Sequence, residues 1–355
     1  MRLLLQWTTS LPILAWILYF SGLIDNHAIF QVAATILLIF SVISAVHHSE
    51  IIAHRVGEPF GTIILAVAIT IIEVSIIVSL MVSGGKEASS LARDTVFSAT
   101  MLILNGIVGL CLFIGALKYK EQNFSKHSAT IALVSIVSIV ILTLVFPSFT
   151  TSKVGPYYST PQLIFVSIAC LIIYSFFLFA QTTRHREYFQ SGDDDDKTKN
   201  VSIGKKVFIT SLGFLIICLA IVVLLAKTLS PTIERIVITN NLPKSLVGII
   251  IAGIILLPEG IAAIVASKNN KLQTSINLAL GSALASIGLT IPCVSVVSIL
   301  FHFDIILGID IKSMLLLGLS VFIVMLSLIS GRTNIVYGAV LLVNLMAYIF
   351  LIINP

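Results

Sequence analysis

The sequence predicts an all-α polytopic membrane protein with about eleven transmembrane helices, formed by one N-terminal helix and two inverted five-helix repeats. The 355 residues are 57% hydrophobic and only 10% charged, whereas soluble proteins carry about 25% charged residues. Apolar runs of about 20 residues recur along the chain, and a helix of that length spans a bilayer. These runs lack the polar–apolar alternation of outer-membrane β-strands. An ordinary water-soluble enzyme and an outer-membrane barrel are therefore excluded.

Eleven apolar stretches divide the chain, and we expect each to form a helix. They lie at residues 8–24, 28–46, 60–82, 94–117, 128–147, 160–181, 206–228, 244–266, 273–300, 308–329 and 334–353. The first stretch is expected to stay in the mature protein, because no small-residue cleavage site follows it. It forms a segment of its own at residues 1–27, before a first repeat at 28–181, an acidic linker at 182–205 and a second repeat at 206–355.

The loops between these stretches differ in positive charge. Thirteen of the 21 Lys and Arg residues lie in loops after even-numbered helices, seven lie in loops after odd-numbered helices, and Arg2 precedes the first helix. Because cytoplasmic loops carry the excess of Lys and Arg, the N-terminus and the linker are predicted to be cytoplasmic and the C-terminus to lie outside. The net charge of +5 therefore indicates topology, and we expect no nucleic-acid partner.

The acidic linker between the two predicted repeats has a simple interpretation. The linker contains the acidic run Asp193–Asp196 followed by Lys197, which is typical of a solvated tether; a cation-sensing role is the alternative. The run is not an EF-hand, because the spaced aspartates and the closing glutamate are missing.

The four cysteines lie in apolar runs without CxxC spacing, so we expect buried packing. The seven histidines are expected at helix ends or in loops, with His54 nearest to Glu58.

Two acidic residues are the strongest functional signal. Of the 16 Asp and Glu residues, Glu73 and Glu259 alone lie well inside an apolar stretch, where each costs about 2.5–3.5 kcal/mol on insertion scales. The segments that precede them, 60–66 and 246–252, align without a gap. The two acids lie five predicted helices apart, and a unit with an odd number of helices enters the membrane in the opposite orientation. Inverted repeats with a site near the midplane are typical of secondary transporters.

Other oxygen-bearing groups accompany the two acids. At about 100° per residue, Thr70 shares a helix face with Glu73, while Glu58 lies at the start of that helix. Pro258, directly before Glu259, frees a backbone carbonyl one turn earlier in its helix. We therefore expect both acids to have additional oxygen ligands nearby.

Three more polar residues are candidates for the same site. Asn105 lies in the fourth predicted helix, and Ser282 and Ser286 lie in the ninth. The alternative for each serine is a hydrogen bond to its own helix. Two carboxylates with carbonyl, hydroxyl and amide oxygens predict a site for a hard cation such as Ca²⁺. Because such an ion is the cargo, no resident cofactor is expected.

The chain resembles the calcium/cation antiporter superfamily and, within it, the ChaA type of bacterial cation/proton antiporter. The resemblance extends over essentially the whole chain and is carried by short motifs. These are Gly57-Glu58-Pro59-Phe60-Gly61, Ile72-Glu73-Val74-Ser75, Arg93-Asp94-Thr95, Pro258-Glu259-Gly260, Gly281-Ser282-x-Leu284-Ala285 and Gly331-Arg332-Thr333-Asn334. The resemblance implies an eleven-helix fold in a bacterial inner membrane, exchange of protons for Ca²⁺ (Na⁺ or K⁺ in some relatives), and Glu73 and Glu259 as ion ligands.

The resemblance leaves the cation open. Where calcium/proton exchangers carry Gly-Asn-Ala-x-Glu, this chain has Ile69-Thr70-Ile71-Ile72-Glu73 and Leu256-Leu257-Pro258-Glu259. A Ca²⁺/H⁺ antiporter is our first hypothesis, and a Na⁺ or K⁺/H⁺ antiporter of the same fold is the alternative. In both, protons and cation compete for one pair of carboxylates.

Three other functional classes fit less well. A membrane enzyme would need a catalytic motif such as HExxH or GxSxG, which the chain lacks. A proton-coupled organic-solute carrier would usually place cationic or aromatic groups at the midplane, and no Lys or Arg lies there. A channel would need a filter-like Gly-rich loop. The expected partners are therefore the lipid bilayer, cations and protons.

Overall fold

The computed structural model describes residues 6–24, 27–56, 68, 70–79, 81, 89–189, 204–240, 243 and 245–354. Nearly all of these residues are helical, as predicted. The chain forms two compact units: unit 1 is Met1–Ser83 with Asp196–Val247, and unit 2 is Gly84–Asp195 with Gly248–Pro355. Each unit combines segments from both predicted repeats, so the units do not coincide with the repeats. The repeats themselves stay a prediction.

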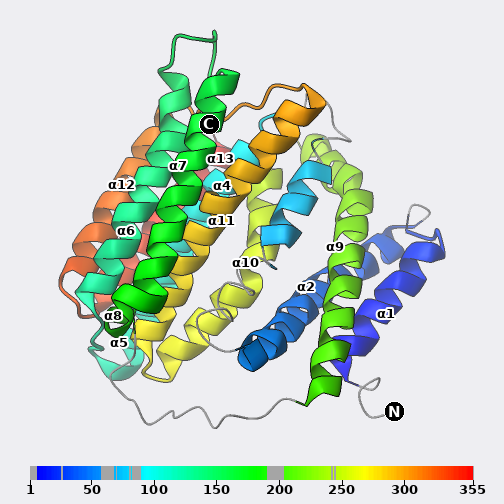
Figure 1. The fold of residues 1–355 in the computed structure, drawn as a ribbon, viewed down its shortest axis with the longest axis horizontal. Helices are drawn as coiled ribbons and strands as arrows, with labels where there is room; N and C mark the ends of the chain where they lie inside the picture. The colour runs from blue at the N-terminus through cyan, green and yellow to red at the C-terminus, as the bar shows by residue number, and fades with distance from the viewer. Residues whose placement is uncertain are drawn as a thin grey trace. The chain divides into compact units, whose positions relative to one another are not determined.

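Unit 1 contains three helices that pack side by side (Figure 1): α1 (Trp7–Phe20), α2 (Ala28–Val56) and α9 (Lys205–Thr239). A shorter helix, Thr70–Ser79, belongs to the same unit. Buried residues recur three or four positions apart along both long helices. They include Ala34, Leu38, Val42 and Ala45 in α2, and Cys218, Ile221, Val222 and Leu225 in α9. This spacing places them on one face of each helix, where they form the core of the unit.

Both long helices of unit 1 exceed their predicted lengths. The sequence predicts ends at residues 46 and 228, whereas α2 continues to Val56 and α9 to Thr239. His48 therefore lies inside α2, with 4% of its surface exposed, and the prediction that every histidine lies at a helix end or in a loop is wrong. Pro231 lies within α9, because a membrane helix tolerates the loss of one backbone hydrogen bond when its neighbours support it.

Unit 2 is built around α11 (Leu272–Phe301), a helix of the second half of the chain that packs against helices of the first half (Figure 1). Its neighbours from the first half are α4 (Leu91–Met101), η3 (Leu102–Ile107), α5 (Val108–Tyr119), α6 (Lys126–Val140), α7 (Thr160–Phe179) and α8 (Arg186–Phe189). The short turns η4 (Ile141–Val145), η5 (Phe146–Ser148) and η6 (Ala180–Arg184) extend α6 and α7. The second half adds α10 (Ser245–Lys268), α12 (Ile311–Ile329) and α13 (Ile335–Ile353).

Local sequence explains where the last two helices begin. Asp310 caps α12 by accepting hydrogen bonds from the backbone N–H and hydroxyl of Ser313. Asn334 caps α13 by accepting from the backbone N–H of Val336 at 2.9 Å. The preceding Gly331 has φ of +68°, a conformation that glycine adopts without strain. The Gly331–Asn334 motif therefore forms the tight connection between α12 and α13.

The described residues confirm a multi-pass membrane fold. Nine of their helices are long and apolar enough to cross a bilayer, and two shorter apolar helices, Trp7–Phe20 and Thr70–Ser79, lie at two further predicted spans. Large apolar side chains cover the outside, for example Phe176 at 69% and Leu315 at 71% exposed. Cys293 is likewise exposed, so the prediction that all four cysteines are buried is wrong. In a bilayer the outer surface is apolar, so an apolar run does not by itself indicate burial.

Candidate ion-binding site

Glu73 lies in the short helix of unit 1. Only 3% of its surface is exposed, and Thr70, one turn earlier, is 5% exposed. Ile77, one turn later, is fully buried, while Ile71 on the other side is 46% exposed. Thr70 and Glu73 therefore share the inner face of this helix, as predicted. Glu58, the predicted residue at the start of this stretch, lies outside the described residues.

Glu259 lies in α10 and is 9% exposed. Pro258 precedes it and has no backbone N–H, so the carbonyl of Ile254 cannot receive the usual helical hydrogen bond. The helix nevertheless continues without interruption from Ser245 to Lys268. No stretch of unwound backbone therefore interrupts α10. The single carbonyl freed by Pro258 is the oxygen that this helix offers near Glu259.

Gly248 allows α10 to approach α4 closely, and Gly260 faces η3 at an ordinary packing distance. A Cβ atom at Gly248 would come within 2.9 Å of the Asp94 carbonyl carbon, and one at Gly260 would come within 3.4 Å of Ile107. The first distance is shorter than a real Cβ contact, so the backbones meet there because position 248 has no side chain. Glu259 is consequently one residue away from the contact between α10 and η3.

The predicted residues of α11 lie in the interior of unit 2. Ser286 is 6% exposed, and Ser275 and Thr290 on the same helix are fully buried. Ser282 is half-buried. These hydroxyls lie four or seven residues apart, so they form a stripe along one side of α11. The stripe supplies oxygen atoms inside unit 2.

Asn105 lies at the centre of η3, where its carboxamide joins a buried network. Its Nδ2 donates to the Met101 carbonyl at 3.2 Å and to Ser320 Oγ at 2.9 Å. Its Oδ1 accepts from Asn344 Nδ2 at 3.2 Å, and Asn344 also donates to Ser320 Oγ at 3.1 Å. Ser320 Oγ donates in turn to the Leu316 carbonyl at 2.7 Å. Asn105 therefore joins η3, which is a π-helical turn, to α12 and α13.

Sequence reasoning did not single out Ser320 or Asn344. Asn344 is an amide inside an apolar stretch and is 6% exposed, so the criterion that selected Asn105 could have found it. Ser320 resembles many other membrane serines in sequence, and nothing in its neighbours distinguishes it. Since π-helical turns are frequent at functional sites, we interpret this network as a support for the segment that contacts α10 beside Glu259.

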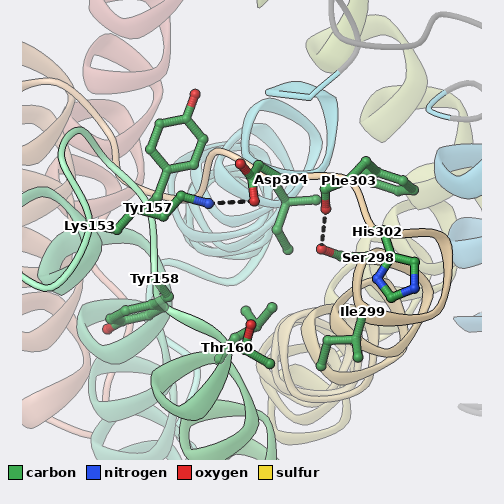
Figure 2. Close-up of a pocket in the computed structure, with 11 residues that line it drawn as sticks. Lys153, Tyr157, Tyr158, Thr160, Ser298, Ile299, His302, Phe303 and Asp304 are labelled. Carbon is green, nitrogen blue, oxygen red and sulfur yellow. Dashed lines mark hydrogen bonds and ion pairs between the residues drawn. The ribbon is translucent and has the colours of Figure 1, made fainter.

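A cavity of about 400 Å³ lies elsewhere in unit 2, between the end of α11 and the segment before α7 (Figure 2). Figure 2 shows the ammonium of Lys153 directed at the carboxylate of Asp304, with which it forms an ion pair. Ser298 donates to the Phe303 carbonyl at 2.6 Å in the same wall. Burial raises the pKa of Tyr158, another lining residue, to about 12. None of the predicted site residues lines this cavity.

The charge distribution among the described side chains separates two acids from the rest. Glu73 and Glu259 are the only buried carboxylates among them. Asp94, also noted from the sequence, is 14% exposed and pairs with Arg93 at 2.8 Å. The described residues contain no group of three or more His, Cys, Asp and Glu side chains that could hold a metal ion. Any cation site in these residues would therefore combine few carboxylates with neutral oxygens.

Comparison with known proteins yields one consistent group. The family model described as sodium/calcium exchanger protein matches residues 27–183 and 210–354. A Sinorhizobium fredii protein, provisionally named as an ionic transporter, is 41% identical over 90% of this chain and 87% of its own length. The sodium-potassium/proton antiporter ChaA of Escherichia coli is 32% identical over 90% of this chain and 87% of its own length.

Solved structures share the same fold. The structure of native YfkE has a TM-score of 0.73 at 18% identity and matches 98% of this chain and 100% of its own. The H⁺/Ca²⁺ exchanger CAX has a TM-score of 0.71 at 14% identity and matches 97% of this chain and 88% of its own.

Proposed function

Because the chain belongs to the sodium/calcium exchanger protein family, we propose that it is a cation/proton antiporter that exports Ca²⁺ in exchange for H⁺. Relatives named as Ca²⁺/H⁺ and sodium-potassium/proton antiporters support exchange of a cation for protons. The observation that carries the choice of site is the burial of Glu73 and Glu259, the two carboxylates enclosed among the described side chains. The transport cycle needs no catalytic residue and no resident cofactor.

The proposed mechanism is competition for two shared carboxylates. Burial and mutual repulsion both favour the protonated acids, so Glu73 and Glu259 load protons on the acidic side of the membrane. On the other side the protons leave and a cation neutralises the pair. An empty site with two buried negative charges is too costly to reorient, and this cost enforces exchange. A divalent ion balances the two charges completely, which favours Ca²⁺.

Neighbouring oxygens complete the proposed site. Thr70 shares the buried face of Glu73, and the Ile254 carbonyl lies one turn before Glu259. Ser282 and Ser286 supply hydroxyls from α11, and Asn105 supports η3 through its network with Ser320. We assign Glu58 a lesser role at the start of its helix, where water can reach it.

A monovalent cation is the second candidate, and one observation favours it. The Escherichia coli sodium-potassium/proton antiporter is 32% identical over 90% of this chain, whereas the Bacillus subtilis Ca²⁺/H⁺ antiporter is 23% identical over 70%. In this alternative mechanism one carboxylate keeps its proton while Na⁺ or K⁺ neutralises the other. The same residues then serve for either cation, and only the number of protons exchanged per cation differs.

Proton flux in proteoliposomes tests the proposal. The purified protein is reconstituted with a trapped pH dye, and Ca²⁺, Na⁺ or K⁺ is added separately. We expect the transported cation to drive proton movement in the wild type and in Glu50→Gln, a matched control because Glu50 is exposed on α2. Glu73→Gln and Glu259→Gln should each abolish the flux, because the amide keeps the volume and removes the charge. Flux near the wild-type rate in either variant would contradict the assignment of Glu73 and Glu259 to the transport site.

We also propose that the protein resides in a bacterial inner membrane, with its N-terminus and acidic linker in the cytoplasm and its C-terminus outside. The excess of Lys and Arg in the loops after even-numbered helices supports this orientation.

A further inference from the structure

A polar chain inside unit 1 connects α1, α2 and α9, and the transport mechanism does not use it. Its centre is the backbone carbonyl of Thr8 in α1. In a regular helix this carbonyl would accept from the N–H of residue 12, but residue 12 is Pro12 and has none. Two side chains of α2, Ser44 and His48, form hydrogen bonds with this carbonyl in place of the missing N–H. Pro12 thus creates an acceptor on α1 that α2 uses.

The direction of each hydrogen bond follows from the available protons. A carbonyl only accepts, so the Ser44 hydroxyl donates its single proton to Thr8. Cys218 Sγ of α9 lies 3.4 Å from Ser44 Oγ, and its thiol must be the donor there. His48 Nε2 lies 3.3 Å from the Thr8 carbonyl and must therefore carry a proton. We call Thr8, Ser44, His48 and Cys218 the α1 clasp.

The remaining nitrogen of His48 is unusual. The ring is buried and stacks on Phe214 of α9, with ring centroids 5.4 Å apart. Its Nδ1 has no hydrogen-bond partner among the described residues. The neutral ring therefore presents a free lone pair in a buried place, and a second proton would bind there without an acceptor. The buried hydroxyls of Thr8 and Ser41 in the same cluster also lack partners among the described side chains.

Among the described residues of α1, α2 and α9, no carboxylate forms an ion pair with His48 that would balance an imidazolium. His47, its neighbour on α2, has its ring centroid 5.6 Å away, and Arg55 of α2 lies over an aromatic ring of α9. Glu50 is exposed on α2, and α9 presents the thiol of Cys218. The described part of α1 contributes no charged side chain. Stacking of a cation on Phe214 offsets only part of the cost of burying it.

We propose that His48 is a second proton-binding site, separate from the membrane carboxylates, and that its protonation releases α1 from α2 and α9. The neutral ring holds the α1 clasp closed by donating to Thr8. The doubly protonated ring carries an unbalanced buried charge and an Nδ1–H without an acceptor, so it favours an open arrangement in which water reaches it. The orientation in the proposed function places the N-terminus in the cytoplasm, and on that basis the clasp responds to cytoplasmic pH.

Tryptophan fluorescence tests this proposal directly. The chain has two tryptophans, and both lie in α1: Trp7 contacts the ring of Phe40 in α2, and Trp16 Nε1 donates to the Ile217 carbonyl in α9 at 3.2 Å. The emission maximum of the full-length protein in nanodiscs is measured from pH 8 to pH 5 without any transported cation. We expect one transition in which the ratio of open to closed protein changes about tenfold per pH unit.

Four variants separate the possible outcomes. His48→Gln can still donate to Thr8 but cannot gain a proton, so its transition should vanish, whereas His47→Gln should keep it. Pro12→Ala restores an N–H that competes for the Thr8 carbonyl, so its transition should move to higher pH; this variant still tests the proposal if His48→Gln does not fold. Glu73→Gln should keep the transition, which separates this site from the proposed transport site. A flat wild-type profile, or a transition retained in His48→Gln, overturns the proposal.

Discussion

At the scale of single residues, Glu73 and Glu259 combine two properties that rarely occur together: they are ionisable and they are almost completely buried. Such a group is expensive in a membrane unless its charge is exchanged for a proton or a cation. In the mechanism proposed above the two acids share one cargo, and apparent pKa values would then belong to the pair.

This sharing predicts how apparent cation affinity depends on pH. For a divalent ion that displaces both protons, log Kd should fall by about two per pH unit while both acids are still protonated, and it should level off at higher pH. A monovalent ion that displaces one proton should show a slope of about one. Isothermal titration calorimetry or flux titrations at several pH values measure the slope of log Kd against pH. An affinity that is constant between about pH 6 and pH 9 would mean that protons and cation do not share a site.

At the scale of elements, Asp310 sets the start of α12. Partial burial pushes its pKa up, but the hydrogen bonds from Ser313 and the charge of Lys312 outweigh that effect and lower the pKa below its ordinary value. Its stabilising effect is therefore complete above the unfolded pKa of about 3.9 and disappears as the pH falls through the lower folded value.

We expect Asp310→Ala to lower the stability by about 1 kcal/mol at pH 7, because it removes the N-cap. Thermal unfolding of the purified protein at pH 7 and at pH 3 measures the effect, and the difference from wild type should shrink at the lower pH. Asp310→Asn is the matched control, since asparagine caps equally well but does not titrate. Equal stability of Asp310→Ala and wild type at pH 7 would contradict the capping role.

The packing of α5 against α13 depends on a glycine. A Cβ atom at Gly338 would come within 2.7 Å of the Cα of Phe113, whereas one at Gly318 in α12 would meet nothing within 4 Å. Gly338→Ala should therefore destabilise the protein by about 1–3 kcal/mol. Gly318→Ala should be neutral or slightly stabilising, because alanine is the better helix former. Similar melting temperatures for the two variants would show that α5 and α13 separate at little cost.

At the scale of the whole molecule, the predicted topology places the acidic linker in the cytoplasm. Its Asp193–Lys197 run lies outside the described residues and matches the recognition sequence of enteropeptidase. The protease should therefore cut the protein into two fragments in inside-out membrane vesicles and leave it intact in right-side-out vesicles. Immunoblotting with tags at both ends detects the fragments. Cleavage in right-side-out vesicles alone would reverse the proposed orientation.

The sequence by itself determined the membrane class, the approximate positions of the apolar helices and which two acids lie inside apolar stretches. Hydropathy and the cost of a buried charge decide these features, and both are properties of short stretches. Short motifs in the sequence likewise indicated the family. Only the tertiary structure decided which polar groups meet. Asn105 binds Ser320 and Asn344, more than 200 residues away, and the carbonyl freed by Pro12 receives Ser44 and His48 from another helix. A polar residue in an apolar helix must find a partner somewhere, but the partner depends on which helices pack together, and no local pattern records that choice.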